Sequence, residues 1–530
     1  MRTWTGDLVE EFDVVVVGSG GAALTAALYA SNTGASVVVL EKSDYLGGTT
    51  AMSGGMIWIP DNQHMRELGI PDDRETALRY LRLVTQGKTD ESALESFVDH
   101  GPEMLAFIEA ESGVRYVSLP NFPDYHREWD GGCAGGRGLE PEPYAVEPLG
   151  ALAESIRELA VPAITQAEIE EWRSTHVAIE PDSGRFARGN ALVAPLVEAC
   201  AEQGVTLVTG CAVERLHVDG GRVDGVQTAD AGLILGTAAV ILACGGYEWS
   251  PDMVARFLPG PIDGSCSARH NTGDGIRMAM AVGAGLGNMT EAWWQPQAKL
   301  PGEEENRGLE VERIWPGTII VNRAGRRFSN EAGNYHDVVK AYHAHDPATG
   351  GFANLPAYLI VDFEHVSRYG FLDYKAGEPG PAWLKTGRTL KEMAAELDID
   401  GDQLTKTVQR FNEYAREGRD PDFHRGETVY ERYLGDQQAP HPALGPVERA
   451  PFFAVEVVSG VIGTKGGITT TPDGVVLNSF GEPIPGLYAA GNTTAHPMGP
   501  GYPGPGGTLG PGMTMAFLAA RHCLSVGVPS

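Results

Sequence analysis

The sequence predicts an α/β protein in which a domain with a parallel sheet is interrupted by an inserted α+β domain. Three observations predict this. Four consecutive valines, Val14–Val17, run straight into a glycine-rich turn, as a strand buried on both faces does before a helix. Similar small-residue turns return near Gly245 and near Gly491. Between Glu291 and about Val458 such turns are absent, and tryptophan, proline and charge are more frequent. We therefore expect one discontinuous domain organised around the first strand.

The turn after the valines fits the pattern G-x-G-x-x-A. Gly18 makes the bend, Gly20 lets backbone approach a pyrophosphate, and Ala23 lets the next helix pack on the strand. The helix itself, Gly21–Asn32, is rich in alanine and leucine. A turn of this kind alone is weak evidence for a ligand, so the residues after the helix carry the interpretation.

A second apolar strand, Ser36–Leu40, ends at Glu41. An acid about twenty residues after the glycines suits a hydrogen bond to an adenosine ribose. Strand, turn, helix, second strand and terminal acid occur in the order and spacing of a Rossmann-like unit. The sequence therefore predicts that a dinucleotide binds here.

A second loop of small residues comes directly after Glu41 and lets backbone amides lie against a phosphate or a flat ring. Its candidate cofactor contacts are Lys42, Gly47, Gly48, Thr49, Thr50, Ser53, Gly54 and Gly55. Later parts of the same domain add further candidates near turns and helix starts. They are Val213, Gly245, Asp274, Gly491, Asn492 and Leu509.

The remaining elements of this domain are expected in chain order. They are two amphipathic helices within 72–110, a helix at 190–203, a strand at 205–208, a hairpin at 213–227, a strand at 238–242, a helix opening at 271–275, a strand at 486–490 and a last helix from about 512. From Val114 the chain is dense in proline, glycine and aromatics, which predicts a long, irregular loop region. We assign 1–112, 183–290 and 460–530 to the cofactor domain, and 113–182 and 291–459 to the catalytic domain.

Composition excludes several classes of function. The 530 residues carry a net charge of −30, which disfavours nucleic-acid or anionic-membrane partners. Residues 1–12 lack a signal pattern, and no run of eighteen apolar residues occurs, so no transmembrane segment is expected. The six cysteines are scattered without C-x-x-C pairs, which argues against a metal site and fits the reducing cytoplasm.

The second loop identifies the dinucleotide. The run from Glu41 to Gly55, E-K-x-x-x-x-G-G-T-T-x-x-S-G-G, resembles the flavoprotein superfamily that includes fumarate reductases and 3-ketosteroid dehydrogenases. The resemblance implies FAD as cofactor. Members with covalently attached flavin carry a histidine close to this loop, where this sequence has Thr50-Ala51-Met52. We therefore expect noncovalent FAD.

The resemblance becomes more specific in three segments that contain tyrosines, at 122–125, 330–335 and 501–506. They are similar to segments of 3-ketosteroid Δ1-dehydrogenases, which introduce a C1–C2 double bond into the A ring. The likeness runs nearly the full length of the chain. It also covers 47–60, D-x-x-F-H-R-G at 420–426, G-T-K-G-G at 463–467, A-A-G-N-T at 489–493 and Y-P-G-P-G at 502–506.

The resemblance implies a role for each of four residues. Tyr335 is the base, Tyr125 is its hydrogen-bonding partner, and Tyr502 with the Gly506 N–H holds the ketone oxygen. The chemistry is consistent with these residue types, because removal of a proton next to a ketone makes an enolate that needs hydrogen-bond donors at its oxygen. The hydride from the β carbon goes to FAD, and a separate electron acceptor must then reoxidise it.

Two alternatives stay open at this stage. The substrate, an apolar cyclic ketone, could be a smaller ring of the cyclohexanone type instead of a steroid. A fumarate-reductase-like enzyme would need arginine and histidine to hold two carboxylates and an arginine as the acid, and Arg137, Arg188 and Arg313 are available. The isolated histidines are interpreted as surface or packing residues. They are His126, His336, His424 and His496.

Overall fold

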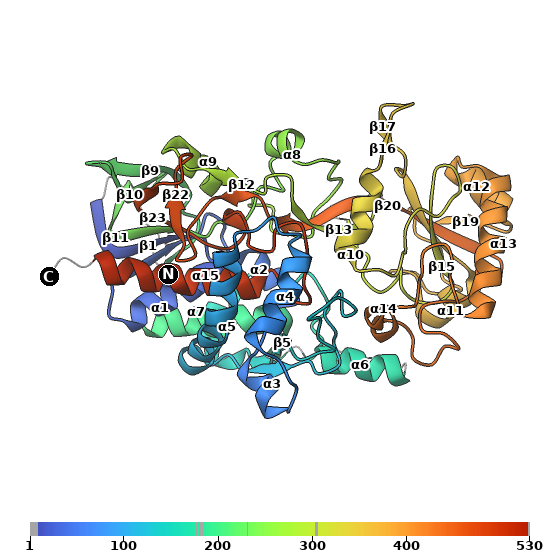
Figure 1. Ribbon diagram of the computed structural model, residues 1–530, viewed down its shortest axis with the longest axis horizontal. Helices are drawn as coiled ribbons and strands as arrows, with labels where there is room; N and C mark the ends of the chain where they lie inside the picture. Colours follow the sequence, from blue (N-terminus) through green and yellow to red (C-terminus); the bar gives the residue numbers. More distant parts are fainter. Residues whose placement is uncertain are drawn as a thin grey trace.

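The protein consists of two sheet-containing bodies side by side, with a layer of helices and short strands beneath their junction (Figure 1). The structure, a computed structural model, describes residues 9–175, 179, 182, 184–230, 232–302 and 306–527. The first eight residues of the segment that lacks a signal pattern lie outside this range, as does the expected domain boundary at 183. The predicted α/β architecture is confirmed.

The first body is built on an eight-stranded sheet in the order β22-β23-β11-β1-β2-β8, with β10 and β9 attached to β11. Its strands are β1 (Val9–Val17), β2 (Val37–Leu40), β8 (Thr206–Val208), β9 (Val213–Asp219), β10 (Arg222–Thr228), β11 (Leu233–Leu242), β22 (Val475–Leu477) and β23 (Pro483–Ala489). Central strand β1 pairs in parallel with β11 and β2, and β11 pairs in parallel with β23. The four valines of β1 are buried, as predicted for a strand covered on both faces. Segments from near the start, the middle and the end of the chain thus contribute strands to this one sheet.

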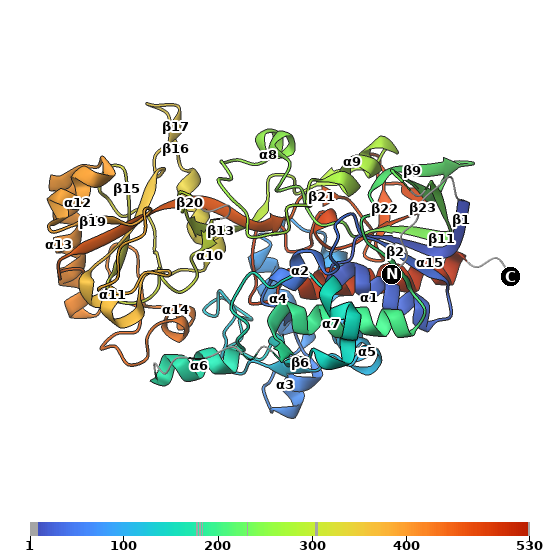
Figure 2. The same ribbon diagram turned by 180° about the vertical axis from the view of Figure 1, so that it is seen from behind.

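Three helices cover one face of this sheet, and α9 lies on the other (Figures 1 and 2). They are α1 (Gly21–Asn32), α7 (Arg188–Glu202) and α15 (Leu509–Gly527), with α9 spanning Asp274–Ala281. Helix α1 packs between α15 and α7. Its alanines allow this close approach, and most of its residues are buried. The helix bounds predicted for α1 match, and the hairpin turning at Asp219-Gly220-Gly221 is confirmed as β9–β10.

The second body is a six-stranded antiparallel sheet in the order β14-β13-β20-β18-β15, with β19 on β20. Its strands are β13 (Ala292–Ala298), β14 (Arg307–Gly308), β15 (Thr318–Asn322), β18 (Ala357–Val361), β19 (Lys385–Gly387) and β20 (Phe452–Thr464). Its helices are α10 (Tyr335–Lys340), α11 (Phe363–Tyr369), α12 (Leu390–Leu397), α13 (Gly401–Glu417) and α14 (Val429–Leu434). The thirteen-residue strand β20 runs from this body back toward the first one (Figure 1). It therefore connects the inserted sheet to the cofactor domain.

The region after Val114 is more ordered than the sequence predicted. It contains β4 (Tyr116–Ser118) and β5 (Gly138–Pro141), which form a small sheet with β3 (Ile57–Trp58). Composition misled here because glycine and proline are dense between the strands, and the strands themselves are only three and four residues long. The other elements near this layer are α2 (Gly48–Met52), α3 (Gln63–Glu67), α4 (Arg74–Val84), α5 (Glu91–Glu111), β6 (Tyr144–Ala145), η1 (Glu147–Ser155), α6 (Gln166–Thr175) and β7 (Arg185–Phe186).

Shorter elements complete the described chain. They are α8 (Pro251–Phe257), β12 (Leu286–Gly287), η2 (Ala341–His343), β16 (His345–Asp346), β17 (Gly351–Phe352), β21 (Gly467–Ile468) and η3 (Gly491–Thr493). All six cysteines are free thiols. Over the described ranges, no helix is both long enough and apolar enough to cross a membrane.

Candidate functional site

The glycine turn lies where the ends of β1 and β11 meet. Gly18 has a φ of +104°, and a Cβ atom there would lie 2.4 Å from the carbonyl oxygen of Ala243. Only glycine satisfies both the backbone conformation and this contact. Helix α1 starts immediately afterwards, and the Gly21 N–H donates to the Thr50 hydroxyl at 3.0 Å. The amino-terminal end of a helix beside small residues is suited to a pyrophosphate, so the local geometry fits a dinucleotide.

Glu41 emerges from the carboxyl end of β2. Its side chain accepts hydrogen bonds from the Ser19 hydroxyl at 2.7 Å and from the Ser43 N–H at 2.8 Å. These bonds fix a nearly buried carboxylate beside the glycine turn. The next residue, Lys42, forms an ion pair with Asp274 at 2.6 Å, which ties the second strand to the start of α9. Two predicted cofactor residues are therefore partners of each other.

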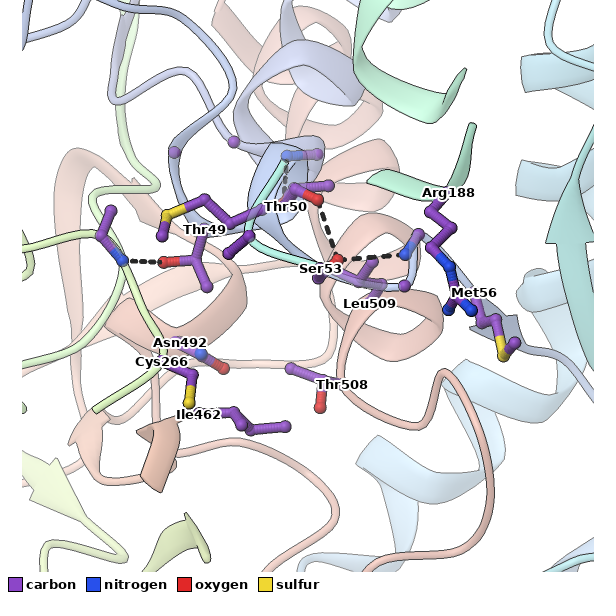
Figure 3. Close-up of a pocket in the computed structure, with 18 of the residues that line it drawn as sticks. Thr49, Thr50, Ser53, Met56, Arg188, Cys266, Ile462, Asn492, Thr508 and Leu509 are labelled. Carbon is purple, nitrogen blue, oxygen red and sulfur yellow. Dashed lines mark hydrogen bonds between the residues drawn. The ribbon is translucent and has the colours of Figure 1, made fainter. Parts of the chain in front are cut away.

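The second small-residue loop folds into the short helix α2 and the turn after it. Ser53 donates to the carbonyl of Thr50 at 2.8 Å and accepts from the Gly55 N–H at 3.1 Å (Figure 3). Thr49 accepts from the Asn271 side chain at 2.9 Å. These bonds connect the loop to the segment before α9. The loop thereby forms a continuous wall next to the glycine turn.

One cavity of about 1130 Å³ joins these loops to the second body. A single ligand commonly fills a pocket of about 300–1,000 Å³, so this cavity has room for a cofactor and a substrate. Most of the predicted residues line it. They are Gly18, Gly20, Glu41, Lys42, Gly48, Thr49, Thr50, Ser53, Gly54, Gly55, Tyr125, Val213, Gly245, Asp274, Tyr335, Gly491, Asn492, Tyr502, Gly506 and Leu509.

Two predicted residues lie behind the wall. Ala23 is fully buried in α1, where a small side chain lets the helix pack closely, as its role in the motif requires. Gly47 is the residue before α2, and a Cβ there would lie 2.7 Å from Ala51 and 2.9 Å from Val193. Its absence of a side chain therefore serves the packing of α2 on α7. Neither residue is among those that line the cavity.

The three predicted tyrosines converge although they come from distant segments. The Tyr125 hydroxyl donates to the Tyr335 hydroxyl at 2.9 Å. The ring of Tyr502 lies 5.1 Å from that of Tyr125 and 5.6 Å from that of Tyr335. A fourth tyrosine, Tyr430 of α14, packs 5.0 Å from Tyr125. All four are buried.

Burial determines the charge state of these phenols. It raises the pKa of Tyr125 and of Tyr335 well above the usual value, and it also raises the pKa of Tyr502. The negative charge of Glu310, which lines the same cavity, acts in the same direction on all three. At neutral pH the three hydroxyl groups are therefore protonated and available as hydrogen-bond donors.

Gly506 lies at the turn before α15 and lacks space for a side chain. Its φ is +90°, and a Cβ there would lie 2.3 Å from the carbonyl carbon of Ile57. Within the residues that the structure describes, its N–H has no hydrogen-bond acceptor. The Tyr502 hydroxyl accepts a bond from Thr508 at 3.2 Å. The tyrosine's own proton and the glycine N–H can thus both be donated to a ligand.

Residues that the sequence did not single out hold Tyr502 in place. Lys465, fully buried, donates to the carbonyl of Gly501 at 2.5 Å and to that of Gly499 at 3.3 Å. The imidazole of His336 bonds the intervening carbonyl of Pro500 at 2.8 Å. Three successive carbonyls before Tyr502 are therefore fixed by side chains from α10 and from the segment after β20. The lysine of the G-T-K-G-G run could have indicated this role, because a lysine among small residues needs a hydrogen-bond acceptor for its amine.

The histidines behave as expected for packing or surface residues. His336 and His496 are fully buried, and burial lowers the pKa of His496 to about 3 and that of His336 well below its usual value. Both rings are therefore neutral. His424 is exposed, and the ring of His126 stacks on Trp129. His336 supports the tyrosine loop, a contribution that the sequence did not reveal.

Two of the three arginines considered for binding a dicarboxylate already bind other groups of the protein. Arg137 forms ion pairs with Asp72 at 2.6 Å and Asp124 at 2.7 Å. Arg313 donates to backbone carbonyls, including those of Glu331 and Gly333. Of the three, Arg188 lines the cavity, beside Ser53 and Met56 (Figure 3). The arrangement offers less to a dicarboxylate than the sequence suggested.

Comparison with known proteins identifies the family. The model of the family described as "FAD binding domain" matches residues 13–509. The chain is 43% identical to 4-oxocyclohexanecarboxylate 2-dehydrogenase of Sinomonas cyclohexanicum, over 96% of this chain and 92% of the relative. It is 38% identical to a 3-oxosteroid 1-dehydrogenase of Mycobacterium tuberculosis, over 97% and 98% of the two chains.

A solved structure supports the same family assignment. The 3-ketosteroid Δ1-dehydrogenase from Sterolibacterium denitrificans, solved in complex with 1,4-androstadiene-3,17-dione, superposes with a TM-score of 0.92 at 34% identity. The match covers 97% of this chain and 100% of that one. The chain therefore belongs to the FAD-binding family that includes the 3-oxosteroid 1-dehydrogenases and 4-oxocyclohexanecarboxylate 2-dehydrogenase, and it is an FAD-dependent oxidoreductase.

Proposed function

We propose that this enzyme introduces a double bond next to the carbonyl of a ring ketone, with Tyr335 as the base, Tyr125 as its partner, and Tyr502 with Gly506 as the oxygen site. The observation that carries the proposal is the Tyr125–Tyr335 hydrogen bond of 2.9 Å inside the cavity that also contains the dinucleotide loops. FAD bound there would accept the hydride that leaves the β carbon. The chain's own residues handle the proton and the developing negative charge.

The ketone oxygen is held by two donors. Tyr502 receives a hydrogen bond from Thr508, so its own hydroxyl proton is directed to the ligand. The Gly506 N–H, without an acceptor among the described residues, is the second donor. Both donors strengthen their bonds as the oxygen becomes an enolate, which lowers the barrier to removal of the α proton.

The α proton passes to the oxygen of Tyr335. Because burial keeps this phenol protonated at neutral pH, it must first release its own proton, and Tyr125 is the adjacent group that can stabilise the phenolate by donating to it. As the α proton goes to Tyr335 and the β hydride leaves with its electron pair, the electrons of the broken α C–H bond form the new double bond. An external acceptor takes the two electrons in a later step.

The FAD is proposed to be held without a covalent bond. A covalent bond would need a histidine beside the flavin ring. His270 lines the cavity but interacts with the charge of Glu41, the residue expected to bind the adenosine ribose, so we assign it to the adenosine end. Acid precipitation of the yellow protein should release the flavin into the supernatant. Flavin that stays on the denatured chain would contradict this part of the proposal.

A 3-ketosteroid is the first candidate substrate, supported by a superposition that covers the whole of a steroid dehydrogenase with its steroid bound. A second candidate, a cyclohexanone that carries a carboxylate, is supported by the 43% identity to an enzyme named for such a substrate. The six free thiols support a reducing, cytoplasmic location.

The deciding experiment is anaerobic bleaching of the bound flavin. Androst-4-ene-3,17-dione, 4-oxocyclohexanecarboxylate and cyclohexanone are mixed separately with the oxidised enzyme, and absorbance of the flavin is followed by stopped flow. Bleaching by at least one ring ketone supports the proposal and ranks the candidates. Failure of all three ketones, together with reoxidation of the chemically reduced enzyme by fumarate, would instead favour the dicarboxylate alternative.

A further inference from the structure

One wall of the cavity contains none of the expected cofactor contacts. This wall is formed by α6, the residues before it, and the segment 306–315. Most of its side chains are apolar. They include Ile164, Ile169, Trp172, Val311 and Trp315. A ligand in this cavity can therefore also contact a largely hydrophobic surface.

Arg173 is one of three charged residues in this wall, with Arg307 and Glu310. It lies near the end of α6, lines the cavity, and is 5% exposed. Its Nε and Nη1 atoms are enclosed and have no hydrogen-bond partner among the described residues. No described carboxylate lies within ion-pair distance of it. Its guanidinium packs 5.4 Å from the ring of Tyr433, whose hydroxyl donates to the neighbouring Glu170.

Of the other four buried arginines that the structure describes, three have carboxylate partners, and Arg313 is held by backbone carbonyls instead. Arg137 is paired with Asp72 and Asp124. Arg327 is paired with Glu331 and Asp420. This difference matters because a buried guanidinium without an anion loses its hydration and has no ion pair to compensate for that loss. A guanidinium without an ion pair on the wall of a ligand cavity can bind an anionic group of the ligand.

We propose that Arg173 binds a carboxylate carried by the substrate on the side of the ring system opposite the reacting ketone. The inference rests on the proposed function, which places the ketone oxygen at Tyr502 and Gly506. A carboxylate is the matching group because it supplies the missing charge and accepts hydrogen bonds from a guanidinium. The source is either a cyclohexanone carboxylate or a 3-ketosteroid with a carboxylated side chain. The two differ in the distance from ketone to carboxylate.

The test compares each acid with its own methyl ester, which has the same ring and lacks the charge. The pairs are 4-oxocyclohexanecarboxylate and a 3-ketosteroid with a side-chain carboxylate, each assayed with an artificial electron acceptor. For the pair whose length fits, the wild-type enzyme should prefer the acid in kcat/KM by about tenfold to a hundredfold. Arg173→Met should remove this preference through KM, because it slows oxidation of the acid far more than oxidation of the ester. Arg173→Lys should retain part of it.

Arg307→Met is the matched control. Arg307 also lines this part of the cavity, but it is paired with Asp373, so its loss should leave the preference for the acid intact. FAD content is measured in every variant. The proposal is overturned if wild type treats acid and ester alike, if Arg173→Met slows both equally or loses FAD, or if Arg307→Met abolishes the preference. Equal oxidation of acid and ester leaves the proposed function standing, whereas oxidation of no ring ketone at all removes both.

Discussion

The hydroxyl groups of Tyr125 and Tyr335 are hydrogen-bonded at 2.9 Å although 210 residues separate them in the sequence. Each tyrosine is positioned by a different set of contacts. The Tyr125 N–H donates to the carbonyl of Pro503, and its neighbour Asp124 is bonded to Trp58 and Arg137. Tyr335 begins α10, which is capped by the side chain of Asn334. The pair therefore depends on contacts among three distant segments, which contain Tyr125, Tyr335 and Pro503.

The first prediction concerns the base. Tyr335→Phe keeps the ring and removes the oxygen that receives the α proton, so flavin reduction by substrate should slow by about 10²–10⁴-fold. Ketone binding should persist, because Tyr502 and Gly506 are unchanged. Stopped-flow reduction gives the rate, and spectral titration gives the affinity. Tyr430→Phe is the control, since it removes a hydroxyl from an equally buried tyrosine of the same cluster. A near wild-type rate in Tyr335→Phe would assign the base to another residue.

The second prediction separates the oxygen site from the base. Tyr502→Phe removes one of two donors to the enolate oxygen, which typically costs about 10²–10³-fold in turnover. Exchange of the ketone's α protons with deuterium should slow as well, because the enolate loses its stabilisation before any hydride moves. Mass spectrometry of the recovered ketone measures this exchange. Normal exchange combined with slow flavin reduction would show that Tyr502 does not contact the oxygen.

The third prediction is an alkaline pH optimum. Burial raises the pKa of Tyr335 well above its usual value, so the phenolate is a small fraction at neutral pH. That fraction grows tenfold per pH unit below the pKa, and log kcat/KM should rise with a slope of about one toward alkaline pH. A profile that is flat from neutral to alkaline pH would contradict a tyrosine base that must be deprotonated.

Glu310 provides a way to shift this profile. Its negative charge raises the pKa of Tyr335, so Glu310→Gln should lower that pKa and move the alkaline rise to lower pH. A single charge at such a site shifts a pKa by about a few tenths of a unit. Glu364→Gln, which changes a half-exposed carboxylate of α11 outside the cavity, should leave the profile in place. Both profiles are measured at saturating artificial acceptor.

Most of the residues that the sequence predicted as cofactor contacts line the one cavity described above. These residues could be predicted because the strand, the turn, the helix and Glu41 all lie in one short stretch of sequence. The Glu41 carboxylate lies beside the glycine turn, as the spacing predicted. The tyrosines were found only through family resemblance, since no periodicity connects Tyr125 with Tyr335. Lys465, His336 and Arg173 were missed for a related reason. Their roles depend on which backbone carbonyls or cavity they meet after the two sheets come together.

The fourth prediction concerns FAD retention. Glu41→Ala removes a carboxylate fixed by Ser19 and Ser43 at the end of β2, where a ribose hydroxyl would donate to it. Loss of such a charge-assisted bond should weaken FAD binding by about 1.5–3 kcal/mol while the fold persists. Fluorescence titration of the apoprotein measures the affinity, and circular dichroism checks the fold. Unchanged affinity would remove Glu41 from the cofactor site.

The last prediction concerns Lys465, which holds the loop that carries Tyr502. Its amine donates to the carbonyls of Gly499 and Gly501 and lies 4.0 Å from the ring of Trp293. Lys465→Met fills similar space without a donor, so both carbonyls lose their partner and the Tyr502 hydroxyl shifts. Misplacement of a catalytic group by about 1 Å can cost about a hundredfold in rate, so kcat should fall by about tenfold to a hundredfold. FAD content should stay normal, because the lysine does not line the cavity.

Lys340→Met is the control, since Lys340 donates to Pro500 in the same loop from a partly exposed position and should have a smaller effect. If the two substitutions reduce kcat equally, or if Lys465→Met acts only by loss of FAD, the lysine does not position Tyr502.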